Sequence, residues 1–556
     1  MHHHTKLQTV TLAALPLTLL LVGVVLMTNM YPLHINSNAG FGPDPSYQYL
    51  FSGVDILLGH SPVHTDHPGT PLQTLIAGII ATTWLGLRSL GITSVGLFDS
   101  VLLLPEVFLC ATSVFLLALT CLANFYLGRS IYKVTQNYWL AISCQVAPLL
   151  YPIVIPNLVF PTPEALLISI SLALLAVLAP VSITQAGTSE PFKRSAASWA
   201  GLLCGLGLAT KLTFAPMLGV LLLLKKPKLI AHAFFWLVAA WLIGVLPIIS
   251  RLAGMFGWFY SLLTHSGIHG AGGANVFDFV QVKMAIGWLI DQFSIFYITL
   301  TALFLLLILS ALVKASKSLW PMLNRHTQLA RLIRPSWPHK LLVDDIMTLS
   351  IFLLVLIAQT LMVAKHLGPT YMVPALSLPL LGIAWILHQQ NIVPVPYKLR
   401  LAISRLCLVV LLAIASFSTV KAIKTVSNTH QQGLQSHHSI QQAVKQFDDP
   451  LVLGAFNCNF LECALWFGMA LVPEMELKTA PVMPNFYYFD IFSKKLHLPG
   501  KGELSDQQTA ETIAALIGQT RPVLLISPPF PHLDKLKLEL ILNTPVQNLY
   551  RVVGLR

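Results

Sequence analysis

Long apolar runs with almost no charged residues recur along this chain and decide what it can fold into. An α-helix needs about 20 predominantly apolar residues to cross a bilayer, and lipid offers no hydrogen-bond partner to an open backbone. Runs of this kind are Leu12–Met27, Val101–Leu127, Leu166–Ala179, Phe234–Ile249, Phe296–Val313, Ile346–Ala364 and Leu401–Phe417. With 55% hydrophobic and 10% charged residues among 556, the sequence predicts an α-helical polytopic membrane protein. A chain of several soluble domains is excluded.

The formal net charge of +12 is concentrated in the apolar part of the chain. Residues 1–420 hold 22 Lys or Arg against 11 Asp or Glu, whereas residues 421–556 hold 12 against 11. Basic residues that flank membrane spans on one side are typical of cytoplasmic loops. The excess therefore reflects membrane topology, and we expect a membrane and no nucleic acid among the partners.

Placing the basic loops in the cytoplasm gives about 11 transmembrane helices in residues 1–420. Residues 31–99 then form a first outer loop, and its short apolar stretch, residues 71–87, is predicted to lie in the membrane interface without crossing it. Residues 199–224 are predicted to form a tight helical hairpin with Lys211 near its outer tip. This topology predicts a multi-pass membrane protein, and together with the family resemblance described below we expect it in the inner (cytoplasmic) membrane.

The composition changes after residue 420, where a balanced, less apolar sequence begins. Short apolar runs at Leu451–Phe456 and Pro522–Ser527 predict buried strands, and residues 505–517 predict a capped helix. Residues 421–556 are thus predicted to be a small soluble α/β domain on the extracytoplasmic side. Cys458 and Cys463 lie outside the apolar runs and would form a local disulfide if this domain is exported.

The stretch from Asn38 to Leu72 is polar for its surroundings, with three Asp, three His and no Lys or Arg. The predicted topology places it on the outer face with further polar and ionisable residues: Glu164, Lys211, Arg251, Lys365, His366 and Tyr371. Immersed charge is costly and usually marks function. A carboxylate that faces a cluster of cations suits a reaction in which a hydroxyl loses its proton and a phosphate departs.

Short motifs in a fixed order carry a family resemblance. They are Gly42-Pro-Asp44-Pro-Ser-Tyr47, His67-Pro-Gly-Thr-Pro-Leu72, Tyr126-Leu-Gly-Arg129, Pro161-Thr-Pro163-Glu164, Gly205-Leu-Gly-Leu-Ala-Thr-Lys211, Lys365-His366 and Tyr371-Met-Val-Pro374. This set resembles the polyprenyl-phosphate-sugar-dependent glycosyltransferases of the GT-C fold, the group of the protein O-mannosyltransferases and the aminoarabinose transferases. The resemblance covers roughly residues 1–420.

The resemblance implies a role for each matching residue. Asp44 would lie beside the anomeric carbon as catalytic base or acceptor-orienting group, and Glu164 would assist it, sometimes through a divalent metal ion. Lys211, Lys365 and His366 would hold the lipid phosphate, and we group the following with them as substrate-binding residues: His67, Arg251 and Tyr371. Two departures from the family pattern bear on a metal site at Asp44 and Glu164. Pro45 replaces the acid that often follows the first Asp, and Pro-Thr-Pro-Glu replaces a more usual Asp, so the metal requirement stays open.

The expected activity is inverting transfer of a sugar from a polyprenyl-phosphate donor to an acceptor hydroxyl of a lipid, glycan or protein at the periplasmic face of the cell envelope. The alternative is a transporter or flippase of a lipid-linked or anionic solute, in which the same cations form a translocation site. That class predicts ionisable residues near mid-membrane and pseudo-symmetric halves.

Each candidate residue also has a structural alternative. Asp44 before a proline is typical of a turn or a helix cap, and Glu164 of a first-turn carboxylate on a helix dipole. Lys211 is long enough to reach the membrane interface, and Lys365-His366 would suit an ordinary helix terminus.

Overall fold

The computed structural model describes most of the chain, with gaps in several loops. The described residues are 2–31, 41, 44–65, 69–183, 190–265, 273, 278–323, 339–366, 368–388, 397–455, 460–469, 486–490, 495–498, 502–518, 521–527 and 536–555.

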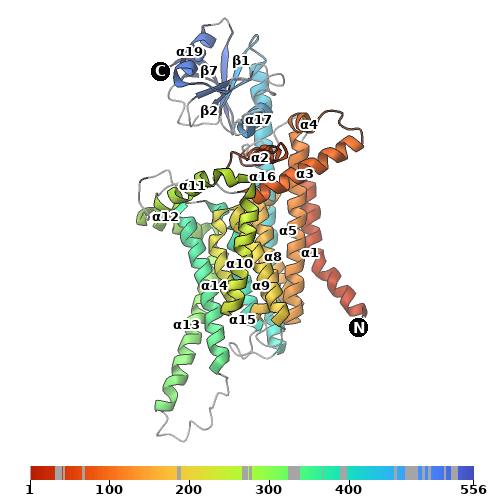
Figure 1. The fold of residues 1–556 in the computed structure, drawn as a ribbon, viewed down its shortest axis with the longest axis vertical. Helices are drawn as coiled ribbons and strands as arrows, with labels where there is room; N and C mark the ends of the chain where they lie inside the picture. Colours follow the sequence, from red (N-terminus) through yellow and green to blue (C-terminus); the bar gives the residue numbers. More distant parts are fainter. Residues whose placement is uncertain are drawn as a thin grey trace.

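A bundle of long apolar helices forms the larger part of the molecule, and a smaller domain that contains a β-sheet lies beyond one end of it (Figure 1). The helical elements are α1 (His2–Met30), α2 (Ser46–Leu57), α3 (Thr70–Ser89), α4 (Leu97–Leu103), α5 (Pro105–Thr135), α6 (Tyr138–Val146), η1 (Ala147–Leu150), α7 (Val154–Val159), α8 (Pro163–Ile183), α9 (Glu190–Thr210), η2 (Leu212–Leu224), α10 (Pro227–Val245), η3 (Leu246–Arg251), α11 (Leu252–Thr264), α12 (Phe279–Gln292), α13 (Ser294–Leu323), α14 (His339–His366), η7 (Pro369–Ala375), α15 (Leu378–His388) and α16 (Tyr397–Val444). We call the end of the bundle next to the sheet the domain end, and the opposite end the far end.

The predicted polytopic helical class is confirmed. Among the described residues, 8 helices are long and apolar enough to cross a membrane, or 9 if the pair α12 and α13, bent by 101°, counts as one span. The segments Tyr138–Leu150 and Leu212–Leu224 are apolar but shorter. The apolar runs predicted from the sequence fall on helical segments in the predicted order, but Val101–Leu127 extends over α4 and α5, and Phe234–Ile249 over α10 and η3.

Helix α3 covers the stretch predicted to lie in the membrane interface. This helix is long and apolar enough to cross a membrane. Figure 1 shows, however, that it lies across the domain end of the bundle and not alongside α5. The structure thus gives its orientation relative to the bundle, and its position in a membrane interface stays a prediction.

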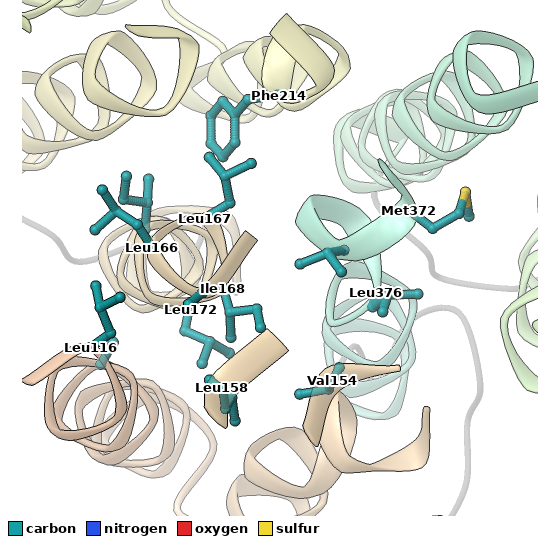
Figure 2. Packing of buried hydrophobic residues seen from close by; sticks show 14 of the residues in the cluster. Leu116, Val154, Leu158, Leu166, Leu167, Ile168, Leu172, Phe214, Met372 and Leu376 are labelled. Carbon is teal, nitrogen blue, oxygen red and sulfur yellow. The ribbon is translucent and has the colours of Figure 1, made fainter. Parts of the chain in front are cut away.

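Helix α8 lies at the centre of the bundle, and most of its residues are buried. Figure 2 shows its leucines packed between neighbouring elements, with Leu167 near Phe214 of η2, and Ile168 and Leu172 near Leu158 of α7. Lipid is as apolar as leucine, so close van der Waals packing, and not exclusion of apolar side chains from water, stabilises such contacts within a bilayer. The dense surroundings fix the first residues of α8 in space.

Helices α9 and α10 approach each other through two glycines four residues apart. A Cβ atom on Gly201 would lie 2.1 Å from the carbonyl oxygen of Ala233, and one on Gly205 would lie 2.3 Å from that of Leu237. Small residues at this spacing let helix backbones come close in membranes. The contact fixes the end of α9, where Lys211 follows.

The C-terminal domain is built on a sheet with the strand order β4-β3-β2-β1-β5-β7-β6. Its elements are β1 (Leu451–Ala455), α17 (Leu461–Met469), β2 (Phe486–Asp490), β3 (Lys495–Leu498), β4 (Gly502–Glu503), α19 (Asp506–Ile517), β5 (Val523–Ser527), β6 (Leu536–Asn543) and β7 (Asn548–Leu555). The central strand β1 pairs in parallel with β2 and β5, and the other pairings are antiparallel. Both predicted strands and the predicted capped helix are confirmed; Ser505 and Gln508 form a capping box at the start of α19.

The C-terminal domain is joined to the bundle by helix and by packing. Helix α16 runs without a break through residue 421, where the composition changes. The apolar core of the bundle also continues into the domain, where it includes Trp466, Tyr488 and Leu549. Cys463 in α17 is disulfide-bonded, in agreement with the prediction for that cysteine; Cys458 lies outside the described residues.

Candidate active site

A buried ion pair lies at the domain end of the bundle. Glu164 is in the first turn of α8, which Thr162 caps by accepting the amide of Ala165 on its Oγ1 at 3.3 Å. Lys211 has an extended backbone between α9 and η2, as expected for the tip of the predicted hairpin. Its Nζ donates to Glu164 Oε1 at 2.5 Å, and the two side chains are 7% and 6% exposed. Burying this pair costs free energy because both charges lose their hydration. Lys211 is therefore a candidate for a functional role.

Tyr371 and Asp44 face the same lysine. The Nζ of Lys211 lies 4.7 Å from the centroid of the Tyr371 ring, an arrangement in which the ring stabilises the ammonium. Asp44 is coupled electrostatically to both members of the pair. Asp44 is an exposed residue by its overall surface, and nearby protein partly desolvates its carboxyl group. This desolvation raises its pKa above the ordinary value, Lys211 lowers it, and the carboxylate of Glu164 raises it further, with a net upward shift.

The end of the first loop is tied directly to the hairpin. The amide of Gly69 donates to the carbonyl oxygen of Thr210 at 3.0 Å. Gly69 has a φ of +59°, and a Cβ there would lie 2.5 Å from the hydroxyl oxygen of Tyr49, so only glycine suits the position. His64 packs edge-on against Tyr49 at 5.5 Å between ring centroids. Burial and the charge of Lys211 lower the pKa of His64 to about 4, so it is neutral near pH 7.

Gln359 connects two segments of the site: η2, which follows Lys211, and η7, which contains Tyr371. It is fully buried on α14, and its Nε2 donates to the carbonyl oxygens of Tyr371 at 2.6 Å and Thr213 at 3.1 Å. Gln359 was not among the residues predicted from the sequence, because a single glutamine in an apolar helix carries no motif. Its polarity at mid-helix in an otherwise apolar span is the signal that would have pointed to it.

An apolar groove starts near the ion pair, because its lining includes Leu166, two residues after Glu164, and it follows the helices toward the far end. Its volume is about 1480 Å³, and α3, α5, α8, α9 and α10 line it. Lining residues run from Phe115 to Val134 on α5 and from Phe192 to Leu206 on α9; at 1.5 Å per residue these stretches cover roughly 20–30 Å. That length is comparable with a hydrocarbon core of about 30 Å. Among the described residues that line the groove, only Lys133, toward the far end, is charged.

The structure brings Asp44, Glu164, Lys211 and Tyr371 together, and it places the other predicted site residues elsewhere or leaves them undescribed. Arg251 ends η3 and is exposed. Lys365, at the end of α14, donates from Nζ to the carbonyl oxygen of Leu263 on α11 at 2.5 Å. His366 is half-buried beside it. His67 lies outside the described residues.

The donor set does not suit a resident divalent metal ion. Within the described part of the chain, no group of three or more His, Cys, Asp or Glu side chains is placed to hold a metal. Glu164 is engaged by the ammonium of Lys211, which would repel a cation between Glu164 and Asp44. We therefore derive no step through a metal.

Comparisons with known proteins find likeness among solved structures. A scan against protein-family models finds no match, and a search of curated proteins finds none. Among solved structures, the chain is similar to the crystal structure of ArnT from Cupriavidus metallidurans bound to undecaprenyl phosphate, with 12% identity over 98% of this chain and 97% of that one and a TM-score of 0.49. A likeness with so low an identity and TM-score supports no inference about activity.

Proposed function

We propose that this chain is a membrane glycosyltransferase of the GT-C kind, which transfers a sugar from a polyprenyl-phosphate donor to an acceptor hydroxyl. The observation that carries the proposal is the buried Lys211–Glu164 pair, coupled to Asp44, beside an apolar groove of bilayer length. A polyprenyl-phosphate sugar has matching parts, a long apolar tail and an anionic phosphate next to the reacting carbon.

The groove would hold the tail, and Lys211 the phosphate. Glu164 accepts from one of the three N–H donors of the ammonium, and the described residues accept from neither of the other two, which would contact phosphate oxygens. Glu164 and the ring of Tyr371 keep the lysine in place in the absence of donor. In this reading Glu164 positions the cation and does not itself act as a base.

Asp44 would act on the acceptor. Its carboxylate takes the proton of the acceptor hydroxyl while the oxygen attacks the anomeric carbon on the side opposite the phosphate. The bond from that carbon to the phosphate oxygen breaks, and the phosphate leaves with the electron pair beside Lys211. The configuration is inverted. A raised pKa suits this role, because a base is most effective when its pKa approaches the working pH.

The sidedness of the reaction is part of the proposal. The candidate site and the C-terminal domain lie at one end of the bundle, whereas α13 ends and α14 begins at the other (Figure 1). In the sequence, residues 314–340 carry six Lys or Arg and no Asp or Glu. Basic loops favour the cytoplasm. We therefore place the site on the periplasmic side of the inner membrane.

The test is donor turnover by the purified protein in detergent, with native membranes as the source of acceptor. Release of polyprenyl phosphate from a panel of polyprenyl-phosphate-linked sugars should depend on Asp44. The variant Asp44→Asn should lose activity by about 10²–10⁴-fold, whereas Asp99→Asn, an exposed carboxylate on α4, should not. Equal rates for the wild type and Asp44→Asn would reject the assignment. Counterflow of a solute in proteoliposomes without a covalent product would favour the transporter class instead.

A further inference from the structure

The C-terminal domain reaches the candidate active site through α2, the helix that begins two residues after Asp44. Nearly all of α2 is buried, because elements pack on it from both the membrane bundle and the C-terminal domain. On the bundle side, a Cβ on Gly53 would lie 2.8 Å from Ile76 Cγ2 and 3.1 Å from the amide of Ala77 on α3. Helix α2 therefore has little room to move toward α3.

On the other side, α2 packs against α17 at a contact that only a glycine permits. A Cβ on Gly468 would lie 2.3 Å from the ring of Phe51 and 2.9 Å from the carbonyl oxygen of Tyr47. Both Phe51 and Tyr47 are fully buried on α2. A carbonyl oxygen of the helix backbone cannot rotate away, so any larger residue at 468 must push α2 and α17 apart.

Helix α17 is itself fixed within the C-terminal domain. It packs on β1 and β2, and its residues Cys463 to Trp466 are buried. Cys463 is disulfide-bonded. On the bundle side, the hydroxyl of Tyr47 donates to the carboxylate of Glu106 at the start of α5. Helix α2 is thus packed between the membrane bundle and the C-terminal domain, and Asp44 precedes its first residue by two positions.

We propose that α17 is a positioning element for the reaction: it holds α2, and through α2 the carboxylate of Asp44, in register with the Lys211–Glu164 pair, and Gly468 sets how closely it does so. This inference rests on the proposed function. It assigns the C-terminal domain a part in the chemistry although it supplies no reacting group. Displacement of a reacting group by about 1 Å can cost about 10²-fold in rate, so a small shift of α2 is enough to matter.

The test compares Gly468→Ala with the double variant Gly468→Ala/Phe51→Leu, which removes part of the opposing ring. Gly554→Ala is the matched control, because a Cβ there meets only ordinary contacts at 3.8 and 3.9 Å in the same domain. Gly468→Ala should lower kcat by about 10–10²-fold with little change in KM for the donor, and the double variant should recover part of the loss. The acidic midpoint of its pH–rate profile should also fall, because Asp44 leaves its desolvated position. Loss of folded protein alone would leave this midpoint unchanged.

Hydrogen exchange of the peptide that covers residues 44–57 provides a readout without activity. Exchange there should rise in Gly468→Ala and return toward the wild-type rate in the double variant. An unchanged kcat in Gly468→Ala, or unchanged exchange in α2, would overturn the inference. If the wild type transfers no sugar, the proposed function fails, and the exchange experiment still decides whether α17 holds α2.

Discussion

The buried pair of Lys211 and Glu164 allows stability and catalysis to be separated by a double-mutant cycle. Glu164→Gln would leave the ammonium of Lys211 buried without its counter-charge, and Lys211→Met would do the same to the carboxylate, since each side chain is under a tenth exposed. Removing one partner of a buried pair typically costs about 3–5 kcal/mol. Glu164→Gln/Lys211→Met removes both charges, so it should be far more stable than either single variant.

Catalysis should follow a different order. Loss of one preorganised donor to a developing charge costs about 2.7–4 kcal/mol, or about 10²–10³-fold in kcat. The double variant should therefore be stable and nearly inactive, because Met supplies no cation to the departing phosphate. Glu164→Gln should keep part of the activity of the protein that stays folded, since Lys211 retains its charge.

Two assays on the same preparations test these expectations: the monodisperse fraction after heating in detergent measures stability, and release of polyprenyl phosphate measures catalysis. The control is the exposed pair Lys226 and Glu190, with side chains 54% and 64% exposed. The corresponding double variant there should change stability by less than about 1 kcal/mol. A double variant at 164 and 211 as unstable as the single ones would show that the charges do not act as a pair. A stable one that turns over at the wild-type rate would show that Lys211 does not serve the phosphate.

Three other expectations concern residues around the pair. The pKa of His64 falls from 6.5 to about 4 on folding, so between these values the unfolded chain binds more protons than the folded one. The free energy of unfolding should therefore fall by about 3 kcal/mol as the pH drops from 6.5 to 4. Heat denaturation measured against pH should vary less for His64→Gln than for the wild type, and parallel curves would contradict the assignment. Gln359→Leu removes the donor to two part-buried carbonyls and should lower the free energy of unfolding by about 1–3 kcal/mol. It should also lower kcat, and an unchanged stability and kcat would contradict its positioning role. Ala173→Trp places a large side chain in the groove and should raise KM for long-chain donors more than for short-chain ones. The control Leu305→Trp, on an exposed face of α13, should not change KM in this way. Equal effects of Ala173→Trp on both chain lengths would argue against a lipid tail in the groove.

The sequence predicted the architecture well because its strongest signals are local. Apolar length identifies a spanning helix by itself, and the capping box at Ser505 identifies the start of α19. The charge asymmetry of loops predicted a topology in which Asp44, Glu164, Lys211 and Tyr371 share one face, and the structure brings these four residues together. The assignment of their chemical roles stays a proposal.

What the sequence could not give depends on contacts between distant segments. Gln359 matters because it bonds to two carbonyls on other elements, and Gly468 because Phe51 and Tyr47 lie against it. Neither contact leaves a pattern in its own neighbourhood. Lys365 looked equivalent to Lys211 as a basic residue at a helix end, but its partner is a carbonyl on α11. The charge of a side chain is visible in the sequence, whereas its partner is set by packing.

The unbroken course of α16 has a mechanical consequence. With 48 residues at 1.5 Å each, it is a rod of roughly 70 Å, more than twice the thickness of a hydrocarbon core. A domain on a flexible linker would sample many orientations relative to the membrane. The C-terminal domain follows α16 directly, so its orientation should change when α16 tilts. Bilayers of different thickness change the tilt of spanning helices. The angle of the C-terminal domain, measured by fluorescence energy transfer to the membrane surface, should therefore follow lipid chain length, and an angle independent of thickness would show that the bundle holds the rod fixed.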